Sequence, residues 1–225
     1  MSNSAETIKA CTAPEPSSAP IDIALTKKNL EFNNFVVHYF ETSQEAVDYL
    51  SSRITGKTVA LGDSRTLLAL NMYEVLKKNN PKVTDINQPL PGENFRDTAL
   101  RTMQHDVFLT SVNALSQTGE LVNIDGTGNR VACSLFGSDE VFFVLGINKI
   151  TPDLASAIHR ARNVAAPLNA KKNKKDSKTP CVIKEDKCYN CASQDRICNA
   201  LTIYYKKMRN MSTMEVIIIN EELGF

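Results

Sequence analysis

TVALGDSRT, at residues 58–66, carries an apolar strand straight into a helix. The first four residues are apolar or β-branched, which is typical of a buried strand. The Gly-Asp-Ser turn that follows offers two candidate helix N-caps, and helical apolar spacing then continues to about Asn79. A buried strand that leads at once into a helix favours an α/β sheet.

The same alternation extends in both directions from this segment. We predict further strands at 35–40, 82–86, 107–110, 120–124, 141–145, 201–205 and 215–220, and helices at 21–32, from 42, 94–104 and from 151. The central strands are apolar throughout, so we expect an open, mostly parallel sheet covered by helices on both faces. Residues 167–180 are predicted to be a basic loop, and the order of elements allows the last two strands to pair with each other.

Composition indicates an ordinary globular protein. The chain has 225 residues, of which 42% are hydrophobic and 23% charged, with a net charge of +1. We therefore expect no nucleic-acid or membrane partner. Residues 1–20 are rich in Ser, Ala and Pro without an apolar signal core, so we predict a disordered leader, a single domain over 21–225 and a cytoplasmic location.

Four cysteines near the C-terminus form the strongest local signal. Cys188 and Cys191 make a CxxC pair, and Cys181 and Cys198 each lie seven residues outside it. Four thiolates at this spacing suit one metal centre, with zinc favoured over a [4Fe-4S] cluster. Reduced structural cysteines and a redox CxxC pair are the alternatives. The cysteine-rich segment, residues 180–199, is therefore predicted to be a metal-binding insert.

Two glycine-containing turns follow predicted strands and could hold an anion. Residues 62–66 offer the hydroxyls of Ser64 and Thr66 near a helix start, although a simple helix cap explains them equally well. Residues 125–130 combine two glycines with Arg130, and a plain tight turn is the alternative. Neither segment matches a P-loop or a dinucleotide fingerprint.

We predict a pocket between 62–66, 111–120 and 125–130 that binds a small anion. No nucleophile–histidine signature is present, and Glu120 is the one candidate acid or base that we single out, with a solvated strand end as its alternative. The predicted ligand-binding residues all lie near predicted strand ends: Ser64, Thr66, Asn113, Thr118, Gly126, Thr127, Gly128, Asn129, Arg130 and Lys149.

Several motifs resemble those of the LUD-domain (lactate utilisation) family. The central ones are VFLTSVNA at 107–114, TGELVNIDGTGNR at 118–130 and VLGINKI at 144–150. RNVAAPLNA at 162–170, DRICN at 195–199 and the closing LGF are similar to a short, cysteine-bearing branch of that family. The resemblance covers roughly residues 25–225. The chain departs from the family's usual Gly-Gly-Ser turn, because it has GDSR at 62–65.

The resemblance implies a fold similar to the sugar-phosphate isomerase and CoA-transferase group. It also implies a link to lactate or related small-carboxylate metabolism, in which iron–sulfur oxidoreductase subunits are possible partners. Two functions remain open. One is an enzyme, or enzyme subunit, acting on a small carboxylate, phosphate or CoA-type ligand. The other is a non-catalytic accessory or assembly subunit of an oxidoreductase complex. Fold and family alone do not fix the reaction.

Overall fold

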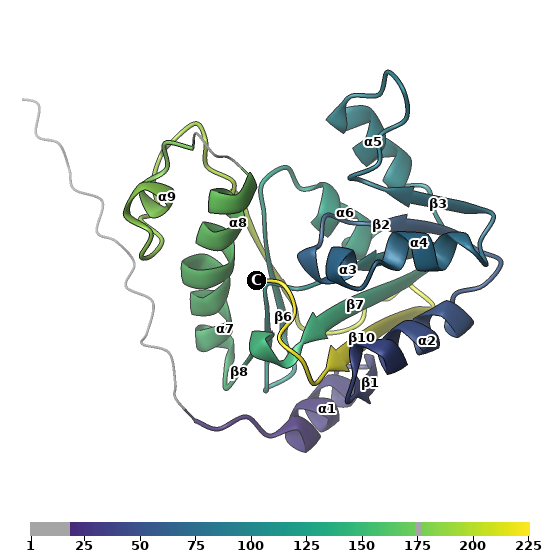
Figure 1. Ribbon diagram of the computed structural model, residues 1–225. Helices are drawn as coiled ribbons and strands as arrows, with labels where there is room; N and C mark the ends of the chain where they lie inside the picture. Colours follow the sequence, from purple (N-terminus) through teal and green to yellow (C-terminus); the bar gives the residue numbers. More distant parts are fainter. Residues whose placement is uncertain (1–18, 174–176) are drawn as a thin grey trace, which may run out of the picture.

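The computed structural model describes residues 19–173 and 177–225 (Figure 1). The predicted leader lies almost wholly outside the described residues, as do residues 174–176 of the predicted basic loop. Among the described helices, none is long and apolar enough to cross a membrane.

A parallel six-stranded sheet forms the centre of the molecule, which confirms the predicted α/β class. Its order is β1-β10-β7-β4-β2-β3, and every neighbouring pair is parallel. The strands are β1 (Val36–Phe40), β2 (Thr58–Leu61), β3 (Lys82–Asp85), β4 (Val107–Thr110), β7 (Glu140–Gly146) and β10 (Thr213–Ile219). The last strand in sequence thus lies inside the sheet, between β1 and β7.

Helices cover both faces of this sheet. One face packs against α2 (Ser43–Arg53), α3 (Arg65–Ala69) and α4 (Met72–Lys77), and the other packs against α1 (Ile23–Phe32) and α6 (Asn129–Leu135) (Figure 1). Alternate residues of β7 serve the two cores, because Phe142 and Val144 join the first and Phe143 joins the second. α5 (Phe95–Thr102) follows β3. The single helix predicted to run to Asn79 is wrong, since a left-handed Asn71, with φ 51°, separates α3 from α4.

A second, smaller sheet has the order β8-β5-β6-β9. Its strands are β5 (Ala114–Ser116), β6 (Leu121–Asp125), β8 (Ile150–Thr151), which follows the 3-10 turn η1 (Ile147–Lys149), and β9 (Ala200–Tyr204). β6 is antiparallel to β5 and β9, and β5 is parallel to β8. The expected pairing of the last two strands with each other is wrong, because β9 joins this sheet and β10 joins the other.

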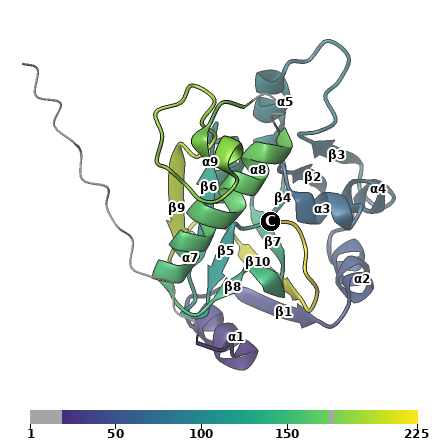
Figure 2. The same cartoon turned by 60° about the vertical axis from the view of Figure 1, so that its left-hand side comes forward.

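One long helical segment packs on the small sheet (Figure 2). It consists of α7 (Leu154–Arg160), a π-helical turn η2 (Ala161–Ala165) and α8 (Ala166–Asn173). The loop predicted at 167–180 is therefore wrong over its first part, where basic residues continue the helix. A short α9 (Pro180–Lys184) begins the cysteine-rich segment.

Candidate functional site

A pocket of about 190 Å³ lies at the carboxyl ends of β2, β4 and β6. The pocket lies at the point where the strand order of the main sheet reverses direction. The reversal occurs at β2, because β3 and β4 lie on opposite sides of it. Ligands of open α/β sheets bind at such reversal points, beyond the carboxyl ends of the strands. The small sheet and α8 supply the opposite wall, through residues that include Ile124, Ala166 and Asn169.

Most of the predicted ligand-binding residues reach this pocket. The lining includes Ser64, Asn113, Gly126, Thr127, Asn129, Arg130 and Lys149. Thr66 lies directly behind it and contacts Lys149, while Gly128 belongs to the same turn without lining the pocket. Sequence reasoning did not find Phe95, Ala166, Asn169, Ile197 and Phe225, which also line it.

Thr118 and Glu120 lie elsewhere, so the pocket does not extend through the whole of 111–120 as expected. They belong to the turn between β5 and β6, at the opposite end of β6 from Asp125. Glu120 and Asp125 are five residues apart along an extended strand, so about 16 Å separates them. Asn29 of α1 and the C-cap Asn33 hold this turn, because their Nδ2 atoms donate to the Gln117 and Gly119 carbonyls at 2.7 and 3.0 Å. Glu120 therefore cannot serve as the acid or base of this pocket.

Lys149 is the most unusual side chain in the pocket wall. It is 3% exposed, and its Nζ bonds the hydroxyls of Ser111 at 3.0 Å and Thr66 at 3.1 Å. Within the described part of the chain, no carboxylate pairs with it. Burial, together with the charges of Arg160 and Arg130, lowers the pKa of Lys149 to about 7. The pocket thus holds an amine that gives up its proton near neutral pH.

Arg130 holds two segments of the chain together through hydrogen bonds, so its guanidinium N–H groups are already engaged and are not free to bind an anion. Its guanidinium donates to the Ser111 and Ile124 carbonyls, at 3.0 and 2.6 Å, and to the Oδ1 atoms of Asn123 and Asn113, at 2.7 and 3.1 Å. Its Nε lies 3.4 Å from Asp125. These contacts fasten the end of β4 to β6, and the charge remains in the pocket wall.

The turn at 125–130 is built on the Asp125 carboxylate, which accepts the Thr127 and Gly128 amides at 3.1 and 2.9 Å. Gly126 has no room for a side chain, because a Cβ there would lie 2.9 Å from the Ile197 carbonyl oxygen. Asn199 also joins the cysteine-rich segment to this turn. Its backbone amide donates to the Asp125 carbonyl and its Nδ2 donates to the Gly126 carbonyl, both at 2.9 Å. The cysteine-rich segment therefore rests on this turn.

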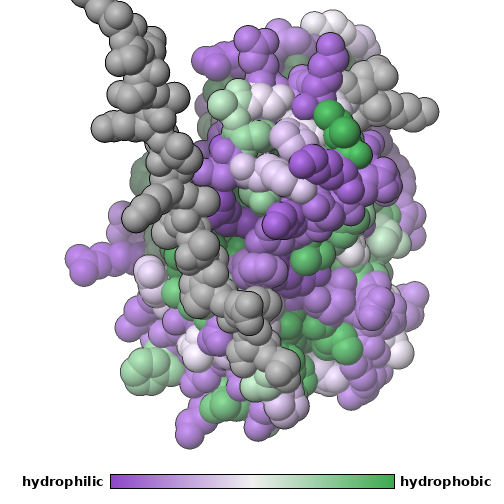
Figure 3. Space-filling view, turned by 90° about the vertical axis from the view of Figure 1, so that its left-hand side faces the viewer, coloured by the Kyte–Doolittle hydropathy of each residue, from purple (hydrophilic) through white to green (hydrophobic). Residues whose placement is uncertain are grey.

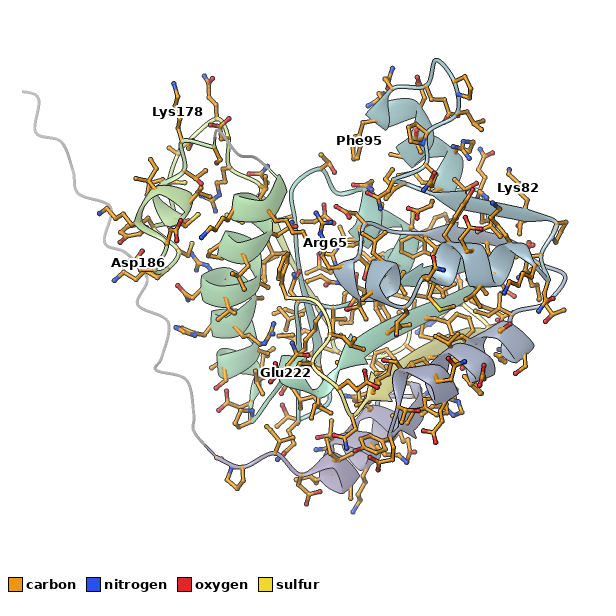
Figure 4. The ribbon with its side chains drawn as sticks, in the orientation of Figure 1. Arg65, Lys82, Phe95, Lys178, Asp186 and Glu222 are labelled. Atoms are coloured by element: carbon orange, nitrogen blue, oxygen red, sulfur yellow. The ribbon has the colours of Figure 1, made fainter. Side chains whose placement is uncertain are left out.

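The opposite side of the pocket comes from the turn after β2. The Ser64 hydroxyl accepts the Leu67 amide at 3.2 Å, which confirms the helix-cap role weighed for it. Arg65 of α3 and Phe95 of α5 lie on the side of these helices that faces α8 (Figure 4). Both residues line the pocket, so aromatic and cationic groups share this wall.

Residues 223–225 pack beside Lys149. The Leu223 amide donates to Asn148 Oδ1 at 3.1 Å, and its carbonyl accepts from Thr66 at 3.3 Å. Gly224 has φ +66°, and a Cβ there would lie 2.8 Å from Thr66 Oγ1 and 3.2 Å from Lys149 Nζ. Phe225 then lines the pocket. This tail thus forms one side of the space in front of Lys149.

All four predicted metal ligands, Cys181, Cys188, Cys191 and Cys198, line one small cavity next to the pocket. Ala166 and Ile197 line both spaces. A hydrogen bond from Cys198 and the charge of Arg162 lower the pKa of the Cys188 thiol. Among the described residues, however, no group of three or more His, Cys, Asp or Glu side chains is arranged to hold a metal ion.

Comparison with known proteins identifies the family. Residues 23–219 match the model of the LUD domain. A crystal structure of a DUF162 family protein from Deinococcus radiodurans superposes with a TM-score of 0.52 at 11% sequence identity, covering 89% of this chain and 99% of that one. At this identity the likeness concerns the fold alone. No curated protein matches the chain.

Proposed function

This chain belongs to the LUD-domain family, and from that premise we propose that it binds a small carboxylate ligand in the pocket beside Lys149. The family supports a role linked to lactate utilisation or related small-carboxylate metabolism. The observation that carries the proposal is a buried lysine whose partners are two hydroxyls. A buried cation without a counter-ion is costly, and an anionic ligand would offset that cost.

Some of the other buried charges in the described part of the fold have a counter-ion, whereas Lys149 has none. At the other end of the main sheet, Glu140 and Glu215 are both buried, and Arg53 Nη2 lies 2.5 and 2.9 Å from their carboxylates. In the pocket wall the cations are Arg65, Arg130 and Lys149, against the carboxylates of Asp63 and Asp125. Asp125 is already paired with Arg130, so its charge does not balance that of Lys149.

Calorimetric titration of the purified protein with lactate, pyruvate and inorganic phosphate tests this proposal. We expect one of the two carboxylates to bind and Lys149→Met to weaken it about ten- to a hundredfold, the value of a charge-assisted contact of about 1.5–3 kcal/mol. Binding should also take up a proton, since an anion raises the pKa of Lys149. Titrations in two buffers of different ionisation enthalpy detect that uptake.

Lys82→Met is the matched control, because Lys82 is exposed at the start of β3 and does not line the pocket. It should leave the affinity unchanged. The proposal is wrong if neither acid binds, or if both lysine variants bind with the wild-type affinity.

We also propose that Cys181, Cys188, Cys191 and Cys198 hold one metal centre, with zinc favoured over a [4Fe-4S] cluster. The support is their common cavity and their donor chemistry, although the thiols would have to close further around an ion. Arg162 and Arg196 also line this cavity and would offset the charge of four thiolates. A bound zinc ion would contribute folding free energy in a reducing compartment such as the cytoplasm.

Metal analysis of anaerobically purified protein tests the metal proposal. We expect about one zinc per chain, lost in Cys188→Ser and kept in Cys133→Ser, whose thiol is buried in the main core. A brown protein with broad visible absorption would replace zinc by an iron–sulfur cluster. Metal at background level, with four freely titrating thiols, contradicts the proposal.

A non-catalytic accessory role in an oxidoreductase complex is the second candidate. The position of Glu120 favours it, because that residue was the one acid or base singled out in the sequence and it lies outside the pocket. The described part of the face formed around α7, α8 and α9 is mostly hydrophilic, with scattered hydrophobic residues (Figure 3). If carboxylate binding requires an added iron–sulfur subunit, the accessory role gains support. Binding by the protein alone favours the first candidate.

A further inference from the structure

We infer that Lys149 is a carbonyl-reactive lysine that captures a 2-oxo carboxylic acid as an imine. The inference rests on the proposed function, since the same pocket must hold the carboxylate of that acid. The inference adds a covalent step to anion binding. It also assigns the ligand class, which is an acid that carries a ketone or aldehyde next to its carboxylate.

The first support is the hydrogen bonding of the amine. Ser111 Oγ and Thr66 Oγ1 lie 3.0 and 3.1 Å from Nζ and 3.4 Å from each other. Both hydroxyls accept from Nζ, and Thr66 donates its own proton to the Leu223 carbonyl. An uncharged amine can satisfy both hydroxyls with its two N–H groups and keep its lone pair. A carboxylate at the same distance would instead stabilise the ammonium form, which has no lone pair for attack on a carbonyl.

The second support is the electrostatic setting. Lys149 is buried, and the two charged groups that act on it most are arginines, which stay protonated. Arg130 is locked by its four acceptors, and Arg160 donates to the Asn148 and Asn113 carbonyls at 3.0 and 2.5 Å. Desolvation and neighbouring cations together are a known way to activate a lysine nucleophile.

The third support is access. Lys149 is part of the pocket wall, together with Asn113 and Arg130, and the pocket volume of about 190 Å³ suits a molecule of a few heavy atoms. A 2-oxo acid places its carbonyl carbon one bond from its carboxylate. The polar side chains of the pocket, such as Asn113, can therefore hold the carboxylate while Nζ meets the carbonyl.

The reaction balances without an oxidant or reductant. The lone pair of Nζ attacks the carbonyl carbon, a C–N bond forms, and the carbonyl π electrons move to oxygen, which takes up a proton. The nitrogen then loses one proton to give the carbinolamine. Its hydroxyl takes up a second proton and leaves as water, because the nitrogen lone pair forms the C=N bond as the C–O bond breaks. Loss of the remaining N–H proton leaves the neutral imine, so the two protons that nitrogen gives up balance the two that leave with the oxygen. Ser111 and Thr66 are the hydroxyls placed to relay these protons. Protonation of the imine restores a buried cation next to the bound carboxylate.

Reductive trapping tests the inference. The protein is incubated with pyruvate and sodium borohydride, which reduces an imine to a stable secondary amine, and the adduct is located by intact-mass and peptide mass spectrometry. We expect one adduct per chain on Lys149, with none from lactate, which lacks the carbonyl. At a pyruvate concentration that leaves most of the protein free, the trapping rate should rise with pH and level off above the pKa of about 7.

Lys149→Arg should abolish the adduct, and Lys82→Met should retain it. Ser111→Ala keeps the amine of Lys149 and removes one of its two hydroxyl partners, so it tests the positioning role of that hydroxyl. Trapping should slow at least tenfold. If pyruvate binds by calorimetry but is not trapped, or is trapped equally on exposed lysines, the inference is wrong and the proposed function stands. If neither pyruvate nor lactate binds, both fail.

Discussion

Lys149 gives the protein a pH-dependent stability whose sign follows from its lowered pKa. The native pKa is about 7, against an ordinary value of 10.5 that applies to the unfolded chain. Below pH 7 the amine is protonated in both states, and its buried charge destabilises the fold. Between these two values the unfolded chain binds a proton that the native state lacks, so stability rises with pH.

We therefore predict that Lys149→Met is more stable than the wild type, most of all below about pH 7. Above that pH the difference in free energy of unfolding should shrink, by at most about 1.4 kcal/mol per pH unit. Urea unfolding of both proteins at several pH values measures it, with Lys82→Met as the control. A difference that stays constant from about pH 6 to about pH 10 would show that the native pKa is not lowered.

For individual residues, the sequence predicted which side chains lie near the pocket, but not the role of each one. Ser64, Asn113 and Lys149 follow strands, and parallel strands bring their carboxyl ends to one edge, so their meeting was predictable. The role of Arg130 was not, because its four acceptors come from two separate segments, the loop after β4 and the strand β6, which only the folded chain brings together. Phe225 lines the pocket through tail packing that leaves no local sequence signal.

Among the elements, the turn at 125–130 and the cysteine-rich segment depend on each other. We predict that Gly126→Ala destabilises the protein by about 1–3 kcal/mol, because its Cβ would press on the Ile197 backbone oxygen at 2.9 Å. The Asn199 amide, which now donates to Asp125, should exchange its hydrogen faster. Hydrogen-exchange mass spectrometry of peptides that contain residues 197–200 measures the effect.

Gly128→Ala is the matched control for that turn. A Cβ at this position has nothing within 4 Å, but its φ of +87° strains any other residue. It should therefore lower stability without faster exchange at Asn199. Equal exchange in the two variants would show that the cysteine-rich segment does not rest on Gly126.

Long elements were predicted better than short ones. The helix expected from residue 42 begins with a capping box of Thr42 and Glu45, and the strands of the main sheet appear as expected. β5 and β8 have only three and two residues, too few to show a period, so the second sheet was missed. α8 was predicted as a loop because its lysines suggested solvent, although alanines such as Ala170 turn one side of it inward.

At the scale of the whole molecule, the long helical segment α7–η2–α8 lies beside both sheets (Figure 2). The pocket lies between this segment and the sheets, and the cysteine cavity lies between the same segment and residues 179–198. Ala166 and Ile197 separate the two spaces, and α8 follows the π-helical turn η2, which contributes Arg162 to the cysteine cavity. π-helical turns are often found at functional sites. We therefore expect a change in the cysteine cavity to affect the pocket through these two shared residues.

The position of β10 has a consequence for the time course of folding. β1 pairs with β10 in the described sheet, and Val36 meets Glu215 there, 179 positions further along the chain. Contacts between such distant segments raise the contact order and slow the search for the native state. Until β10 docks, β1 lacks that neighbour and one side of β7 stays open, so a partly folded chain presents two unprotected strand edges. Such edges are sites of aggregation, and we expect refolding yield to fall as protein concentration rises.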